Sequence, residues 1–146
     1  MFQFEAQHRT SSDRDRRILR RETVETEVFS MAVSPLADRR CIPCKGGTPP
    51  LTAAQIAPLL AQLEGWTVED NEKLGKSYRF KNFVQAVEFV NALTRVAEEE
   101  GHHPDLYVRW GEVRVYLWTH KIDGLTESDF FMAAKIDRAY VNRPSA

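Results

Sequence analysis

The chain has 146 residues, of which 42% are hydrophobic and 28% are charged, and its net charge at pH 7 is −1. This composition is typical of one soluble globular domain, and the nearly neutral charge argues against nucleic acid or an anionic membrane as a partner. No apolar run approaches the roughly 18 residues that a membrane span needs. The first residues lack the apolar core of a secretory signal, so we expect a cytoplasmic protein, with organelle targeting left open.

The N-terminal segment, residues 1–40, differs in character from the rest of the chain. It holds eight arginines against seven acids and has no sustained apolar period, which predicts a poorly ordered tail. Met31 opens a stretch that resembles a natural N-terminus, so a native start at Met31 is an alternative. The predicted domain spans residues 41–146, and its first residues are rich in glycine and proline.

The first half of this domain predicts a helix followed by two strands. Thr52 begins a capping box, and the apolar residues after it recur at helical spacing to about residue 65. Pro58 lacks a backbone donor inside this helix and should kink it or delay its start. Short alternating stretches then predict strands over residues 66–69 and 76–80, joined by a polar turn.

A second helix and a β-hairpin follow. Asn82 is a favourable N-cap for this helix, and Gly101 is well placed to end it in a left-handed conformation. Alternating apolar residues over 106–117 predict two strands, with a turn at residues 111–112 between them.

The last predicted element is a helix that begins at Thr126, with Asp129 placed to complete its cap. The whole order is helix, strand pair, helix, strand pair, helix. It predicts an α+β fold, a two-layer sandwich in which three helices cover one face of a four-stranded antiparallel sheet. The two open edges of such a sheet favour a homo-oligomer, either a dimer or a tetramer.

Three of the four histidines should gather at one end of this sheet. His102 and His103 occupy a helix-to-strand corner, because Pro104 biases the residue before it towards extended backbone. His120 ends the second strand of the hairpin, which is the neighbour of the start of the first. Trp118 shares strand parity with His120, so an aromatic surface can lie beside that ring.

The histidine cluster is open to three interpretations. A lone histidine is most often a surface residue or a satisfied core residue. A three-histidine zinc site would leave an open position for water, but adjacent histidines rarely aim both rings at one metal. Acid–base catalysis is the third interpretation, because imidazole titrates near neutrality, at a pKa of about 6.5.

Two further features have chemical potential. Cys41 and Cys44 could be half a zinc site or a redox pair, but without a second cysteine pair we expect reduced cysteines of minor structural importance. The acidic run at residues 98–100 lies at a helix C-terminus, where the helix dipole disfavours it. This placement favours a partner in the pocket for one of the three acids.

Several stretches of the sequence together resemble the pterin-4a-carbinolamine dehydratase family. They are CIPCKGG, LEGWTV, EGHHPDLYV, WTH and GLTESDFFMAAKID, which span about residues 41–141. EGHHPDL and WTH resemble the plant and bacterial branches, because the animal enzymes carry an acid in place of Gly101 and a serine in place of Trp118. The family's fold, three helices against a four-stranded antiparallel sheet that oligomerises, agrees with the predicted order of elements.

The resemblance implies dehydration of 4a-hydroxytetrahydropterin to quinonoid dihydropterin, with no metal or organic cofactor. This step recycles the pterin of the aromatic amino acid hydroxylases, so a hydroxylase is an expected partner. The resemblance implies catalytic roles for His102, His103 and His120, with His103 as the chief acid–base group. It also implies that Asp129 steadies the third histidine, and that the pterin contacts a set of neighbouring residues, namely Glu98, Gly101, Pro104, Trp118 and Thr119.

Two other functions compete with the dehydratase. One is a non-catalytic binding protein of the same fold, acting in transcriptional dimerisation or in Rubisco assembly. The retained histidines favour the enzyme over this alternative. The other is a zinc hydrolase built on the three histidines.

Overall fold

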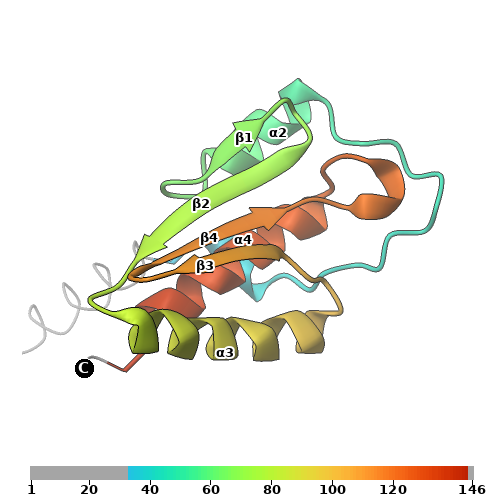
Figure 1. Cartoon of the computed structure of the whole chain (residues 1–146). Helices are drawn as coiled ribbons and strands as arrows, with labels where there is room; N and C mark the ends of the chain where they lie inside the picture. The colour runs from blue at the N-terminus through green and yellow to red at the C-terminus, as the bar shows by residue number, and fades with distance from the viewer. Residues whose placement is uncertain (1–32, 145–146) are drawn as a thin grey trace, which may run out of the picture. The chain divides into compact units, whose positions relative to one another are not determined.

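The computed structural model describes residues 33–144 of the chain (Figure 1). Most of the expected tail, and the alternative start at Met31, lie outside the described residues. The compact unit begins at Val33, before the expected boundary at residue 41. The reason is a short 3-10 helix, η1 (Pro35–Asp38), which buries two apolar residues of the expected tail and contacts the last helix, α4 (Glu127–Val141).

Helix α2 (Ala53–Leu60) begins at the predicted capping box of Thr52. Pro58 lies inside the helix and does not delay its start. The expected end near residue 65 is wrong. The backbone N–H of Ala61 still bonds to the fourth residue back, but those of Gln62 and Leu63 bond to the third, as in Leu63 N to Leu60 O at 3.0 Å, so the regular helix stops at its cap.

Strands β1 (Thr67–Glu69) and β2 (Lys73–Arg79) form an antiparallel pair. The expected start of the second strand at residue 76 is wrong. Asp70 and Asn71 adopt left-handed backbone, with φ of 51° and 58°, and this closes the turn before residue 73. Gly75 is a strand residue rather than a turn residue, and a Cβ there would lie 3.2 Å from a tyrosine ring of the neighbouring strand.

Helix α3 (Phe83–Glu100) begins and ends at the predicted residues. The Asn82 side chain accepts a hydrogen bond from the backbone N–H of Gln85 at 2.9 Å, which satisfies one free donor of the first turn. Gly101 ends the helix with a φ of 62°. This left-handed residue redirects the chain into the next strand.

Strands β3 (Asp105–Arg109) and β4 (Glu112–Leu117) form the predicted hairpin. Its turn lies one residue earlier than expected, because Arg109 and Glu112 already face each other in the ladder. Gly111 takes a φ of 69° there, and a Cβ on it would lie 2.9 Å from the carbonyl oxygen of Phe80. Only glycine fits so close to a neighbouring backbone.

The four strands form one antiparallel sheet in the order β1-β2-β4-β3, which confirms the predicted α+β fold. Figure 1 shows α3 and α4 on the same side of this sheet. The residues that face them are buried, and they include the paired Leu74 and Leu117 and the paired Tyr78 and Val113. No helix in the described part of the chain is long and apolar enough to cross a membrane.

Candidate active site

A cleft lies where the end of α3, the segment after β4 and the start of α4 meet. Its volume is about 330 Å³, and small-molecule sites commonly occupy about 300–1,000 Å³. We call it the histidine cleft, because all three histidines line it, which confirms that they converge. The expected site residues along it are His102, His103, His120, Gly101, Trp118 and Thr119.

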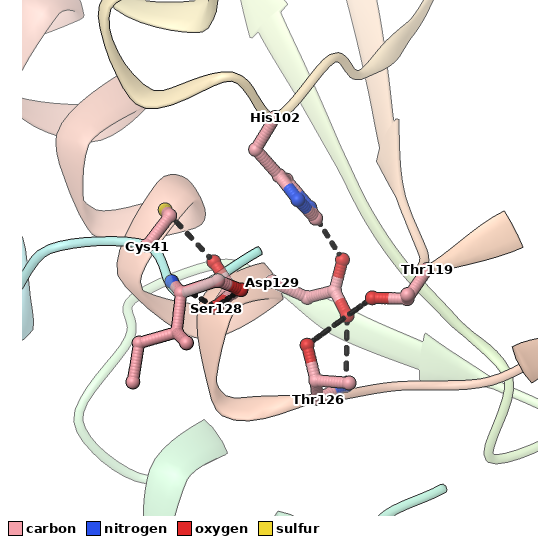
Figure 2. Close-up of polar contacts among 7 residues, drawn as sticks. Cys41, His102, Thr119, Thr126, Ser128 and Asp129 are labelled. Atoms are coloured by element: carbon pink, nitrogen blue, oxygen red, sulfur yellow. Dashed lines mark hydrogen bonds and ion pairs between the residues drawn. The ribbon is translucent and has the colours of Figure 1, made fainter. Parts of the chain in front are cut away.

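His102 is held by a buried carboxylate. It follows the helix end at Gly101, and its Nε2 lies 2.7 Å from Oδ1 of Asp129. The side chains of this pair are 16% and 0% exposed. Because a carboxylate only accepts hydrogen bonds, Nε2 carries the hydrogen, and Nδ1 is the nitrogen left to exchange a proton. Figure 2 shows the ring pointing at the carboxylate.

Asp129 joins the cap of α4 to the cleft. Its Oδ2 accepts from the backbone N–H of Thr126 at 2.8 Å and from the Thr119 hydroxyl at 2.9 Å (Figure 2). The resemblance implied that Asp129 steadies the third histidine, His120. The structure corrects this, because the first turn of α4 faces the corner after α3, and the carboxylate contacts His102 there.

His103 has an exposed partner. Its Nε2 lies 2.7 Å from Oε1 of Glu98, and the two side chains are 61% and 70% exposed. Glu98 is not among the residues that line the cleft, and neither is the half-buried Pro104. The polar contact of Glu98 in this arrangement is with His103, whereas the resemblance implied a direct contact with the pterin.

His120 lies in the short 3-10 helix η2 (His120–Ile122), against an aromatic surface. Its ring stacks on Trp118, with centroids 4.2 Å apart and planes 21° from parallel. This confirms the predicted aromatic neighbour. The ammonium of Lys73 lies 4.2 Å from the centroid of the Trp118 ring, so the stack also carries a cation at close range.

Several residues that line the cleft were not expected as site residues from the sequence. They come from the segment before α2, from the end of α3, from η2 and from the start of α4, and they are Cys41, Ile42, Pro43, Cys44, Glu100, Lys121, Thr126 and Ser128. Two sequence signals covered the first four, namely the Cys-x-x-Cys spacing and the CIPCKGG stretch of the family resemblance. The spacing drew attention to the thiols, and neither signal gave information on where the segment packs.

Glu100 is the acid of the run 98–100 that has a partner in the cleft. Its Oε2 accepts from the backbone N–H of Cys41 at 2.9 Å, and its Oε1 lies 3.0 Å from Nζ of Lys135. Burial alone would raise the pKa of Glu100. The Cys41 N–H and the Lys135 ammonium outweigh burial and hold this pKa below its ordinary value.

The arrangement is suited to proton transfer. Two imidazoles each have a carboxylate on one ring nitrogen and keep the other nitrogen for a ligand, and a third imidazole lies on an aromatic surface in the same cleft. Within residues 33–144, no three His, Cys, Asp or Glu side chains are arranged so that they could hold a metal ion.

The model of the family described as pterin 4 alpha carbinolamine dehydratase matches residues 49–139. A relative from Rubrobacter xylanophilus, named "Putative pterin-4-alpha-carbinolamine dehydratase", is 52% identical over 106 residues, which cover 73% of this chain and 99% of the relative. A relative of the same name from Rickettsia bellii is 53% identical over 103 residues, which cover 70% of this chain and 91% of the relative.

A solved structure agrees with these relatives. The crystal structure of the transcriptional coactivator/pterin dehydratase from Brucella melitensis is similar with a TM-score of 0.58 and 34% identity, over 62% of this chain and 97% of that chain. The fold, the histidine cleft and the extent of these matches lead to one conclusion: the chain belongs to the pterin 4 alpha carbinolamine dehydratase family.

Proposed function

We propose that this protein dehydrates a 4a-hydroxytetrahydropterin to the quinonoid dihydropterin by histidine acid–base catalysis. The observation that supports it is the cleft itself, where three imidazoles meet and one of them is held by the buried Asp129. We take the pterin class of substrate from the names of the two relatives and of the Brucella protein, because each name describes a dehydratase of pterins.

The reaction needs one acid and one base. The bond between C4a and the hydroxyl oxygen breaks, and that oxygen leaves as water after it gains a proton. N5 loses its proton, and the C4a–N5 double bond forms. Electrons are neither gained nor lost, so the balance needs no oxidant or reductant, and hydroxide is a poor leaving group unless an acid protonates it.

We assign His103 as the chief acid–base group, with His102 and His120 assisting and binding the pterin. Two features of His103 support this. Its Nδ1 is left for the ligand, and its exposure lets it regain a proton from water between turnovers. His102 is fixed in a buried network instead, which suits a group that must hold one orientation.

The decisive variant is His103→Ala. Loss of a general acid–base group costs roughly 10²–10⁴-fold in rate, so formation of quinonoid dihydropterin from synthetic carbinolamine should fall by that factor. Asn91→Ala, an exposed change on α3 away from the cleft, should leave the rate unchanged. Wild-type rates in the His103→Ala protein would contradict the assignment of His103.

A non-catalytic binding role is the competing proposal. The Brucella protein supports this alternative, because that protein is described as a transcriptional coactivator as well as a pterin dehydratase. Purified protein that shows no dehydratase activity, but recovers one stoichiometric partner in a pull-down, would favour this role. Bound zinc in the purified protein would favour the hydrolase. A cytoplasmic location and a hydroxylase partner belong to the dehydratase proposal.

The homo-oligomer is part of the same proposal. Among residues 33–144, the outer strand β3 pairs with β4 alone and leaves its other edge free. The hairpin it belongs to exposes large side chains, with Tyr107 at 58% and Trp110 at 72%. Pairing this edge with a second copy would satisfy its backbone groups. Light scattering that finds only monomer would contradict the proposal.

A further inference from the structure

The segment Cys41–Cys44, which we call the CIPC segment, lines the histidine cleft with all four of its residues. It precedes the residues 49–139 that match the family, so the match assigns it no role. Its backbone belongs to no helix or strand. Its position in the cleft therefore depends on its contacts with other elements.

Side chains of α3 and α4 hold the backbone of the CIPC segment. The buried Ser128 hydroxyl accepts from the N–H of Ile42 at 2.9 Å and lies 3.2 Å from the carbonyl oxygen of the same residue. The N–H of Cys41 donates to Glu100 at 2.9 Å. Ser128 directly precedes Asp129, so the segment is tied to the element that holds His102.

The residues before the CIPC segment are anchored as well. Leu36 and Ala37 of η1 are buried in the core. Lys135 of α4 donates to the carbonyl oxygen of Ala37 at 3.0 Å and pairs with Glu100 at the same distance. The Lys135 ammonium therefore links η1, which precedes the CIPC segment, to Glu100, which binds the backbone of that segment.

The Cys41 thiol is part of this anchoring. Its sulfur lies 3.5 Å from the carbonyl oxygen of Ser128, and Figure 2 shows the two side by side. Burial, together with the nearby Glu100 carboxylate, raises the pKa of Cys41 to about 12. The thiol therefore stays protonated at neutral pH and donates a hydrogen bond, whereas a reactive cysteine needs a thiolate.

Ile42 is the apolar surface that this anchored segment presents. Its backbone is held by Ser128, yet the residue is 71% exposed and lines the cleft. The stacked rings of Trp118 and His120 line the same cleft. A planar ring system has two faces to cover, and sites for such ligands are built mainly from apolar and aromatic side chains.

We propose that the CIPC segment is a substrate-binding wall of the histidine cleft, in which Ile42 packs against one face of the bound pterin ring. This inference rests on the proposed function and adds a specificity-determining residue to it. A contact of this kind is made equally to substrate and transition state, so its loss raises KM and leaves kcat nearly unchanged.

The test compares Ile42→Ala with Val84→Ala. Val84 is 63% exposed on α3 and lies outside the cleft. Ile42→Ala should raise KM about tenfold, near the low end of what a lost apolar pocket contact costs, and should weaken binding of 7,8-dihydropterin by calorimetry to a similar degree. Val84→Ala should change neither. Ser128→Ala, which frees the segment, should raise KM in the same direction while circular dichroism shows a folded protein.

The outcomes separate this inference from the proposed function. If the wild type is active and Ile42→Ala has unchanged KM and dihydropterin affinity, the proposed role of Ile42 is contradicted and the proposed dehydratase function is not. An inactive wild type that binds dihydropterin through Ile42 overturns the dehydratase and supports the wall. A wild type that neither reacts nor binds overturns both.

Discussion

Two adjacent histidines have carboxylate partners at the same distance, in very different surroundings. His102 and Asp129 lie 2.7 Å apart with side chains 16% and 0% exposed, whereas His103 and Glu98 lie 2.7 Å apart at 61% and 70%. Distance alone would rank the two contacts as equal. Exposed ion pairs contribute only about 0–1 kcal/mol to stability, since water and salt screen them. Burial therefore fixes the His102 ring, whereas the exposed His103 ring can reorient.

The difference arises from the elements that carry the partners. Asp129 is locked in the first turn of α4, where Thr126 and Thr119 occupy its second oxygen. Glu98 projects from the exposed side of α3, and within the described part of the chain its one polar partner is His103. The buried contact therefore fixes the orientation of the His102 ring, whereas the exposed contact leaves the His103 ring accessible to solvent.

Of the substitutions at the two carboxylate partners and near them, Asp129→Asn should have the largest effect on stability and on kcat. The amide turns one acceptor into a donor, so either His102 or the helix cap loses its partner, and unfolding free energy should fall by about 1–3 kcal/mol. A displaced catalytic group can cost about 10²-fold in rate, so kcat should fall by about that factor. Urea unfolding and steady-state kinetics measure the two effects.

Asp137→Asn is the matched control for this variant. Asp137 lies on the same helix, is 14% exposed, and accepts from Trp66, Lys76 and Tyr78 on the other side of the core. Its replacement should lower stability and leave kcat unchanged. An equal loss of kcat in both variants would mean that Asp129 acts through general stability and does not position His102.

A smaller effect should follow from Glu100→Gln, which removes a partly buried carboxylate near the same corner. The folded pKa of Glu100 lies below its ordinary value of 4.5. Its stabilisation is therefore complete above the unfolded pKa and is lost as pH falls through the folded pKa. At pH 7 the variant should be less stable by about 1 kcal/mol.

The acid limb of the stability curve tests the same contact. Between pH 4.5 and lower values, Glu100→Gln should lose less stability than the wild type, because the group that titrates there is gone. The neighbouring exposed Glu99 is the control, and Glu99→Gln should follow the wild-type curve. If the unfolding free energies of the wild type and Glu100→Gln fell equally as the pH was lowered, the contacts of Glu100 with Cys41 and Lys135 would make no contribution to the pH dependence of stability.

Much of the fold could be predicted from local sequence signals. The caps act within a few residues of themselves: the three helices start directly after Thr52, Asn82 and Thr126, and α3 ends at Gly101. Strand boundaries were less accurate. The three-residue turn after β1 depends on the left-handed backbone of Asp70 and Asn71, and the central pairing of β2 with β4 depends on contacts between distant residues. Periodicity encodes neither.

The same limit applied to the site. The histidine corner could be predicted, because a helix end, a proline and a hairpin define it locally. The wall of the cleft could not, since Cys41 meets Glu100 across 59 residues and Ile42 meets Ser128 across 86. Nor could the carboxylate partner of His102, because Asp129 already had a local role as a helix cap.

The smallest effect should come from Glu98→Gln, the exposed half of the comparison. Among the described residues, Glu98 forms a hydrogen bond or ion pair with His103 alone, and it does not line the cleft. Unfolding free energy should therefore change by less than about 0.5 kcal/mol, and kcat should fall less than in Asp129→Asn. Added salt should reduce the difference in unfolding free energy between the wild type and Glu98→Gln further, because salt screens the exposed pair. A loss of kcat or a rise in KM larger than that of Asp129→Asn would reverse the ranking. It would then favour the direct pterin contact that the family resemblance implied for Glu98.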